Sequence, residues 1–156
     1  MARGGRGDRA RPHLPGGRLD IVGAMPVDIT WRGPFDNAEV NALHAEAFEH
    51  RLSDDDWEGL TQRHSLGWAI ARQGGALVGF INVLWDGACH AFIEDLMVGQ
   101  AVRRQGIGMR LVAAAREGAR EAGCDWLHVD FDEANRAFYI VACGFSPTGS
   151  GLIALR

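Results

Sequence analysis

Lysine is absent from this 156-residue chain, and all 16 basic side chains are arginine. Without a lysine amine the chain cannot form a Schiff base with a carbonyl substrate, which excludes lysine-dependent aldolase and pyridoxal phosphate chemistry. A Walker A phosphate loop is excluded as well, because its lysine reaches the phosphates. Any anion that the protein binds must therefore be held by arginine, by backbone N–H groups or by the N-terminus of a helix.

The chain also lacks the marks of a metal site, a membrane span or a secreted precursor. Its three cysteines, Cys89, Cys124 and Cys143, are odd in number and far apart, with no CxxC and no Cys/His spacing typical of zinc. No apolar run approaches the ~20 residues of a membrane helix, and the N-terminus has no apolar signal-peptide core. We therefore expect a cytoplasmic protein that binds neither a metal nor a membrane.

Charge is unevenly distributed along the chain, whose formal net charge is −4. Residues 1–24 carry five arginines and two aspartates, a balance of +3, whereas the remaining 132 residues carry 11 arginines and 18 acids, a balance of −7. An acidic domain argues against nucleic-acid binding and favours a cationic or amine-bearing partner.

Residues 1–24 differ in composition from the rest of the chain. They are rich in glycine, arginine and proline and have neither a helical nor a strand period. We interpret them as a disordered leader, as an artefact of a start assigned upstream of Met25, or as a basic tail with a purpose of its own. Residues 25–156 are expected to form one domain.

From Val27 onward the pattern predicts alternating strands and helices. Strands are expected over 27–32, 67–73, 76–86, 91–98, 125–131 and 147–156, and helices over 37–50, 54–64, 106–122 and 134–143. Asp36 or Asn37 can cap the first helix, and Ser53 can cap the second. The order β-α-α-β-β-β-α-β-α-β predicts an α/β domain of the α+β type, with one mixed sheet and helices on both faces.

The segment 97–111, MVGQAVRRQGIGMRL, carries the clearest sign of a binding site. A strand ends near Val98, a loop with Arg103 and Arg104 follows, and QGIG at 105–108 opens the long helix. Glycine lets the backbone approach a ligand closely, and the free N–H groups at a helix N-terminus favour an anion. We interpret the segment as a diphosphate cradle without lysine. The alternative is a glycine-rich helix start that only turns the chain.

A dinucleotide-binding Rossmann site is a weaker interpretation of the same glycines. Gly106 and Gly108 fit a GxGxxG pattern and Asp130 follows 22 residues after Gly108, but Leu111 stands where the third glycine belongs. Seven residues separate Val98 from Gly106, and no second βαβ unit follows.

The R-x-x-G-x-G pattern at 103–108, after a strand that ends L-x-V at 96–98, resembles motif A of the GNAT acyltransferase superfamily. Asn135, Phe138, Tyr139 and the Gly144-Phe145 pair resemble the family's downstream N…FY…GF motif. The two motifs occur in the right order with the right elements between them. The resemblance covers the chain from about Val27 to the C-terminus.

The resemblance implies a V-shaped opening between the strand that ends at Val98 and the strand over 126–131, with acetyl-CoA as co-substrate in the opening. Backbone groups of Leu96 and Val98 would pair with the pantetheine arm, and N–H groups from Arg104 to Met109 would hold the pyrophosphate. Asn135 would contact the pantetheine or help to fix the cofactor. The implied cofactor-binding residues are Leu96, Met97, Val98, Arg103, Arg104, Gln105, Gly106, Ile107, Gly108, Met109, Asn135 and Tyr139.

The same resemblance implies catalysis by Tyr139, the only tyrosine in the chain, as the acid that protonates the leaving thiolate. A tyrosine hydroxyl is a plausible proton donor for that step. The alternative is a packing aromatic beside Phe138. One departure is visible, because four residues separate Tyr139 from Gly144, where many family members have three.

The general base is expected on one of the two strands that flank the opening. Glu94 is the first candidate and Asp95 the second, on opposite faces of one strand, and His128, which shares a face with Asp130, is the third. The remaining histidines of the domain show no ligand spacing and are expected to be solvated or to support other side chains: His44, His50, His64 and His90.

The first two helices and the loop between them are expected to line the acceptor side, with candidates Phe48, Arg51, Leu52, Asp54, Asp55, Trp57 and Trp85. We predict an N-acetyltransferase that moves an acetyl group from acetyl-CoA directly to an amine of a small molecule or peptide. The alternative is a regulatory module of the same fold that binds CoA without catalysis. The resemblance also makes a homodimer possible.

Overall fold

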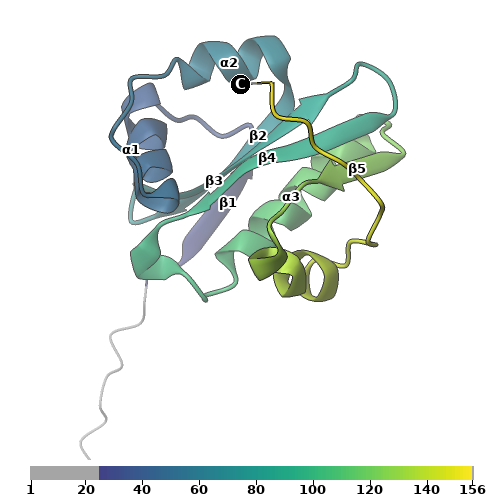
Figure 1. Cartoon of the computed structure of the whole chain (residues 1–156). Helices are drawn as coiled ribbons and strands as arrows, with labels where there is room; N and C mark the ends of the chain where they lie inside the picture. The colour runs from purple at the N-terminus through teal and green to yellow at the C-terminus, as the bar shows by residue number, and fades with distance from the viewer. Residues whose placement is uncertain (1–24, 156) are drawn as a thin grey trace, which may run out of the picture.

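The computed structural model describes residues 25–155. One five-stranded sheet forms the centre of the molecule, and helices cover both of its faces (Figure 1). The strands are β1 (Val27–Trp31), β2 (Ser65–Gln73), β3 (Ala76–Trp85), β4 (His90–Val98) and β5 (Trp126–Val129), and the main helices are α1 (Asn37–Phe48), α2 (Trp57–His64) and α3 (Ile107–Glu121). The predicted mixed sheet and the helices on both faces are confirmed.

The strands lie in sequence order across the sheet. The pairs β1–β2, β2–β3 and β3–β4 are antiparallel, and β5 is parallel to β4 because α3 crosses over between them. After β5 the chain forms a short 3₁₀ turn, η2 (Glu133–Asn135), and then a π-helix, η3 (Ala137–Ala142). The single helix that the pattern predicts over 134–143 is thus two short pieces.

Each face of the sheet has its own core. Ile81, Val83 and Ile93 pack against α3 on one face, where Leu111 and Ala115 are fully buried. On the other face Phe80 and Met97 pack against α1 and α2 through buried side chains that include Val40, Leu43 and Trp57. Successive side chains of a strand point to opposite faces of the sheet and therefore contribute to two separate apolar layers, as a sheet covered on both sides requires.

The caps of the first two helices explain where they begin. Asp36 caps α1 in a reciprocal capping box with Glu39, as one of the two predicted choices. The predicted cap Ser53 is wrong for α2, because Asp56 accepts the Gly59 N–H and is the N-cap. Ser53 instead donates to the buried Asn41 at 3.0 Å. Asn41 also accepts from the indole of Trp57 and so holds the α1–α2 loop to α1.

Trp31 at the end of β1 packs between the edge of the sheet and α3. Its indole lies against Gly67 of β2 and Gly118 of α3, and a Cβ at either glycine would overlap the ring. The two glycines therefore let the indole reach between strand and helix, where a side chain would exclude it.

The predicted last strand over 147–156 is wrong for the part that the structure describes, since residues 147–155 have no strand. Leu152, Ile153 and Leu155 are each more than four-fifths exposed, so burial contributes nothing that would hold an extended segment in place. The predicted leader, residues 1–24, lies outside the described residues. Within 25–155 no helix has the length and the apolar character that crossing a membrane requires.

Candidate active site

The strands β4 and β5 separate halfway along β4. Their pairing ends at Ile93 and Val129, while β4 continues for five more residues to Val98. A cavity of about 640 Å³ opens where the strands separate, and a neighbouring cavity of about 310 Å³ shares several of its lining residues. The opening expected between these two strands is present.

The larger cavity reaches the N-terminus of α3. Gly106 caps the helix with φ of +77°, and Arg104 precedes it with φ of +61°, so the chain turns sharply through two left-handed residues. Among residues 25–155 no side chain caps the first turn of α3, so within this range its N–H groups are open to an anion. A Cβ on Gly106 would find no atom of the described residues within 4 Å, which marks open space beside the backbone in this part of the chain. These features fit a diphosphate cradle.

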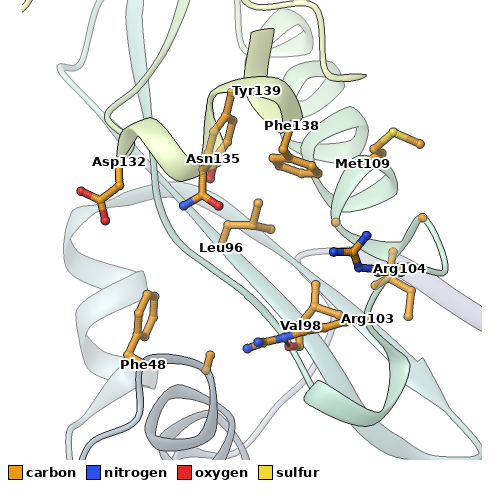
Figure 2. Close-up of a pocket in the computed structure, with 14 residues that line it drawn as sticks. Phe48, Leu96, Val98, Arg103, Arg104, Met109, Asp132, Asn135, Phe138 and Tyr139 are labelled. Carbon is orange, nitrogen blue, oxygen red and sulfur yellow. Dashed lines mark hydrogen bonds between the residues drawn. The ribbon is translucent and has the colours of Figure 1, made fainter. Parts of the chain in front are cut away.

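Most of the residues expected to bind a cofactor do line this cavity, and Figure 2 shows them around it. They are Leu96, Val98, Arg103, Arg104, Gly106, Ile107, Gly108, Met109, Asn135 and Tyr139. Two expected residues are not in that lining. Met97 is fully buried in the core beneath α1, because β4 turns its side chain to the other face, and the exposed Gln105 lies outside the lining.

Arg103 is tied to the end of β4. Its Nε donates to the carbonyl oxygen of Val98 at 3.1 Å. The guanidinium is therefore positioned beside the strand end and the cavity, while its terminal nitrogens keep their hydrogen-bonding capacity. Arg104, on the opposite side of the turn, also lines the cavity (Figure 2).

Gly108 lets a ring approach α3 closely. A Cβ at this position would lie 3.2 Å from Cζ of Phe138. The absence of that carbon allows η3 to pack against the first turn of α3, so the second glycine of the motif brings the Tyr139 segment close to the N-terminus of this helix. The motif's two glycines thus have different structural tasks.

The extra residue between Tyr139 and Gly144 is accommodated by the π-helix. The N–H of Cys143 donates to the carbonyl of Phe138, five residues earlier, at 2.9 Å, where an α-helix would use a residue four earlier. The wider turn takes up one residue, and Tyr139 lines both cavities. The departure from the motif spacing therefore leaves Tyr139 at the site.

Tyr139 is only 8% exposed and is surrounded by rings. It stacks on Phe131 and meets Phe138 and Phe145 edge-on. Burial, reinforced by the negative charge of the Cys143 thiolate form and of Glu94, raises the pKa of Tyr139 to about 12. The hydroxyl consequently stays protonated across the ordinary pH range and can act as a proton donor.

The candidate bases Glu94 and Asp95 line the same, smaller cavity. The register of β3 with β4 shifts there, since Phe80 pairs with Met97 and Asn82 with Glu94. Two residues of β4 thus oppose one residue of β3, a β-bulge, and Asp95 takes φ of +50°. The prediction that the two carboxylates lie on opposite faces is wrong, because the bulge breaks the strand's alternation.

Both carboxylates have raised pKa values. Burial is the main cause for Glu94, with Asp95 and Asp130 adding like-charge repulsion. Burial also raises the pKa of Asp95, against the opposing effect of His44. Raised carboxyl pKa values beside a cavity are typical of catalytic acids and bases.

Four histidines of the described residues form two contacting pairs, although His44, His50 and His90 show no ligand spacing in the sequence. Nδ1 of His44 lies 2.6 Å from Nε2 of His50, and Nε2 of His44 lies 3.7 Å from the Asp95 carboxylate. His90 and His128 are 2.7 Å apart. His128 therefore faces His90 and is absent from the lining of the two cavities that hold Tyr139. No spacing rule links His44 to His50, because the left-handed Glu49 turns the chain back at the end of α1.

Among the expected acceptor-side residues, Phe48 lines both cavities. Trp57 is 5% exposed and belongs to the core, and Trp85 lies at the far end of β3, where its indole donates to the carbonyl of Ala88. Arg51, Leu52, Asp54 and Asp55 are exposed and absent from the lining of either cavity. Sequence reasoning missed Asp132, which lines both cavities.

Asp86, Cys89 and His90 come together at the β3–β4 turn, with ligand-type atoms within 4.8 Å of one another. The Asp86 carboxylate there accepts the backbone N–H groups of Ala88 at 2.7 Å and of His90 at 3.1 Å. These hydrogen bonds give Asp86 a structural role, because its carboxylate closes the turn between β3 and β4.

Comparison with known proteins places the whole arrangement in one family. The model of the acetyltransferase (GNAT) family matches residues 30–145. A probable glucosamine 6-phosphate N-acetyltransferase of Oryza sativa subsp. japonica is 40% identical over 57 residues, which are 36% of this chain. The match spans about a third of that relative's length (34%).

Solved structures share the fold over most of this chain. A GNAT family acetyltransferase of Streptococcus pneumoniae is 27% identical, with a TM-score of 0.65, over 84% of this chain and 100% of that one. An aminoglycoside N-acetyltransferase in complex with CoA is 20% identical, with a TM-score of 0.67, over 87% of this chain and 98% of the other. With the family model matching most of its length, the chain belongs to the GNAT family of acetyltransferases.

Proposed function

We propose that the protein transfers an acetyl group from acetyl-CoA to an amine of a small molecule. The observation that carries the proposal is the junction of two cavities at the separation of β4 and β5, with Tyr139 in the lining of both. The larger cavity would hold the donor and the smaller one the acceptor, so the tyrosine hydroxyl would lie where the two meet.

The larger cavity suits the donor. The free N–H groups of the first α3 turn and the guanidinium groups of Arg103 and Arg104 would hold the diphosphate. Leu96, Val98 and Asn135 line the continuation of the cavity and would hold the pantetheine arm. When bound, acetyl-CoA would supply the activated acetyl group.

Tyr139 would protonate the sulfur as it leaves. Its raised pKa of about 12 keeps the proton on the oxygen at neutral pH, so the hydroxyl is available as a donor when negative charge develops on the departing sulfur. Phe131, Phe138 and Phe145 hold the ring in a fixed orientation, so the proton is delivered without a search over rotamers.

The smaller cavity suits an amine. Glu94, Asp95, Asp130 and Asp132 contribute carboxyl groups to its lining. Such a lining attracts a cationic amine, and a carboxylate within it can remove the proton that an ammonium must lose before its nitrogen attacks. Relatives named for aminoglycoside and glucosamine phosphate acetylation support a small, polar amine as the acceptor.

Two measurements test the proposal. Acetyl-CoA should raise the Tm of the protein, and thiol release from acetyl-CoA should appear with at least one member of a panel of aminosugars, polyamines and peptides. The Gly106→Asp variant is the control for specific binding, since its charge would repel the diphosphate. A protein that acetyl-CoA stabilises but that turns over no amine would favour a CoA-binding module without catalysis. A Tm unchanged by acetyl-CoA and by CoA would contradict both functions.

A further inference from the structure

We propose that Asp95, His44 and His50 form the route by which a proton leaves the acceptor, with Asp95 as the base and the two histidines as positioning residues that pass the proton to solvent. The proposal rests on the acetyl transfer proposed above. It selects Asp95 over Glu94, because contacts connect Asp95 to a chain of titratable groups that runs from the cavity to the surface.

The route consists of one ion-pair distance followed by two hydrogen-bond distances. The carboxylate of Asp95 lies 3.7 Å from Nε2 of His44. Nδ1 of His44 lies 2.6 Å from Nε2 of His50, and Nδ1 of His50 lies 2.6 Å from the carbonyl oxygen of Arg51. The first group lines the smaller cavity, and the last imidazole is exposed.

The Arg51 carbonyl, at the end of this series of contacts, determines where the protons lie when His44 and His50 are both neutral. A carbonyl oxygen only accepts, so Nδ1 of His50 must carry a hydrogen, and in the neutral ring Nε2 is then an acceptor. His44 must donate to that acceptor through its own Nδ1–H. Nε2 of His44 is therefore left with a free lone pair, and it is the nitrogen that faces Asp95. The network thus presents a vacant proton acceptor to the carboxyl group.

The fold holds both ends of the first step in place. Asp95 occupies the β4 bulge at φ of +50°, which turns its side chain toward α1. The ring of His44 packs against Phe48 and Trp57, with centroids 4.7 and 5.2 Å away. The side chains of His44 and Asp95 are 22% and 29% exposed, so their interaction is only partly screened by water.

The charges around the pair make transfer between its members easier. Burial lowers the pKa of His44 and raises the pKa of Asp95, which brings their proton affinities closer together. Asp55, on the loop before α2, adds a negative charge that acts on His44. Glu94 on β4 lies beside Asp95, and Asp130 and Asp132 complete the acidic lining of the same cavity.

The proton balance of the transfer requires such a route. An ammonium acceptor loses two protons when its nitrogen forms the amide bond and the carbon–sulfur bond of the thioester breaks. One proton ends on sulfur through Tyr139. The other must leave, and Asp95 takes it and gives it to Nε2 of His44. The Nδ1 proton of His44 moves on to Nε2 of His50, and the exposed His50 then releases its Nδ1 proton to solvent. Both rings return to the Nδ1–H tautomer before the next turnover.

The first test needs no turnover. Long-range ¹⁵N–¹H NMR should show both His44 and His50 as the Nδ1–H tautomer when neutral. Asp95→Asn, which keeps a residue type that tolerates positive φ, should lower the pKa of His44 because a negative charge is lost. His64→Gln, at the end of α2, is the matched control and should leave the His44 signal unchanged. An Nε2–H tautomer on His44, or a His44 pKa that Asp95→Asn does not lower, would overturn the proposal.

The second test uses turnover. Asp95→Asn should lower kcat by roughly 100-fold, the low end of general acid–base catalysis, with an unchanged Kd for acetyl-CoA. His44→Gln removes a packed ring, so the exposed His50 offers the safer variant. His50→Gln should lower kcat in dilute buffer and regain it with added imidazole, an external proton carrier. The wild type and His64→Gln should not depend on imidazole.

The outcomes separate this proposal from the one on which it depends. A wild type that binds acetyl-CoA but acetylates no amine would remove the proposed acetyl transfer, and the proton route with it. A wild type that is active, while Asp95→Asn or His50→Gln keeps full kcat in every buffer, would overturn the proton route alone.

Discussion

The ring of Tyr139 stacks on the ring of Phe131, with centroids 5.0 Å apart and planes 26° from parallel. Phe138 and Phe145 meet the same ring edge-on at 4.9 and 6.0 Å. The position of the ring therefore depends on aromatic packing, which a phenylalanine would reproduce. A Tyr-to-Phe change consequently tests the hydroxyl group without disturbing its surroundings.

Tyr139→Phe should lower kcat by roughly 100-fold with little change in the Kd for acetyl-CoA, since only the proton donor is removed. Steady-state kinetics with the best amine of the panel, together with calorimetric titration of acetyl-CoA, measures both quantities. Because the pKa of Tyr139 is about 12, ionisation of its hydroxyl should cause no loss of rate between pH 7 and 9. An unchanged kcat would remove the hydroxyl from the reaction.

Gly106→Asp should weaken acetyl-CoA binding by about 100-fold or more, because a like charge placed beside a diphosphate costs several kcal/mol. Gly106→Asn is the matched control. Both residues tolerate the φ of +77°, and a Cβ at this position has no neighbour within 4 Å in the part of the chain that the structure describes, so both variants should fold. The asparagine variant should lose far less affinity in calorimetric titration. Equal affinities for the two variants would argue against a diphosphate at this turn.

Gly118→Ala should lower the free energy of unfolding by about 1–2 kcal/mol, because overpacking against the rigid Trp31 indole outweighs the helix propensity that alanine adds. Urea denaturation measures the change. In a Trp31→Leu background the same substitution should become stabilising, since the obstacle is gone. The same sign in both backgrounds would show that the indole is not what makes glycine necessary there.

Glu39 should make folding sensitive to acid. Its hydrogen bonds with Arg72, both 2.7 Å long, lower its pKa below the ordinary value of 4.5. A carboxyl pKa lowered by folding stabilises the protein above the unfolded pKa, and that stabilisation is lost as the pH falls through the folded pKa. Between pH 7 and pH 3, wild type should therefore lose more unfolding free energy than Glu39→Gln. The exposed Glu121→Gln is the control and should behave like wild type.

The sequence predicted the elements well wherever periodicity and local chemistry decide the structure. The strands from Val27 to Val98 and the helix after Gly106 are in their predicted places, because their apolar faces are buried against one another. The predicted strand after Pro147 is wrong, since its apolar residues find no core in the described part of the chain. A hydrophobic pattern predicts a strand only where a partner is available to bury it.

The larger cavity of the candidate site was predictable from the sequence, and the smaller cavity was less so. Backbone geometry at Gly106 follows from local sequence, whereas the shared cavity of Glu94 and Asp95 depends on a one-residue bulge that alternation cannot reveal. The approach of His44 to His50 likewise depends on a left-handed turn at Glu49, a residue type that seldom takes that conformation. Tertiary contacts between separate elements determine these features.

The π-helix η3 also affects how the sequence of this chain should be aligned with the sequences of its relatives. One residue inserted into an α-helix turns everything after it by about 100°, which would carry a side chain to another face. Here the wide turn confines the insertion to the stretch between Tyr139 and Gly144. Relatives with one residue fewer can therefore retain both positions, and a sequence alignment pairs the two correctly only with a gap inside this helix.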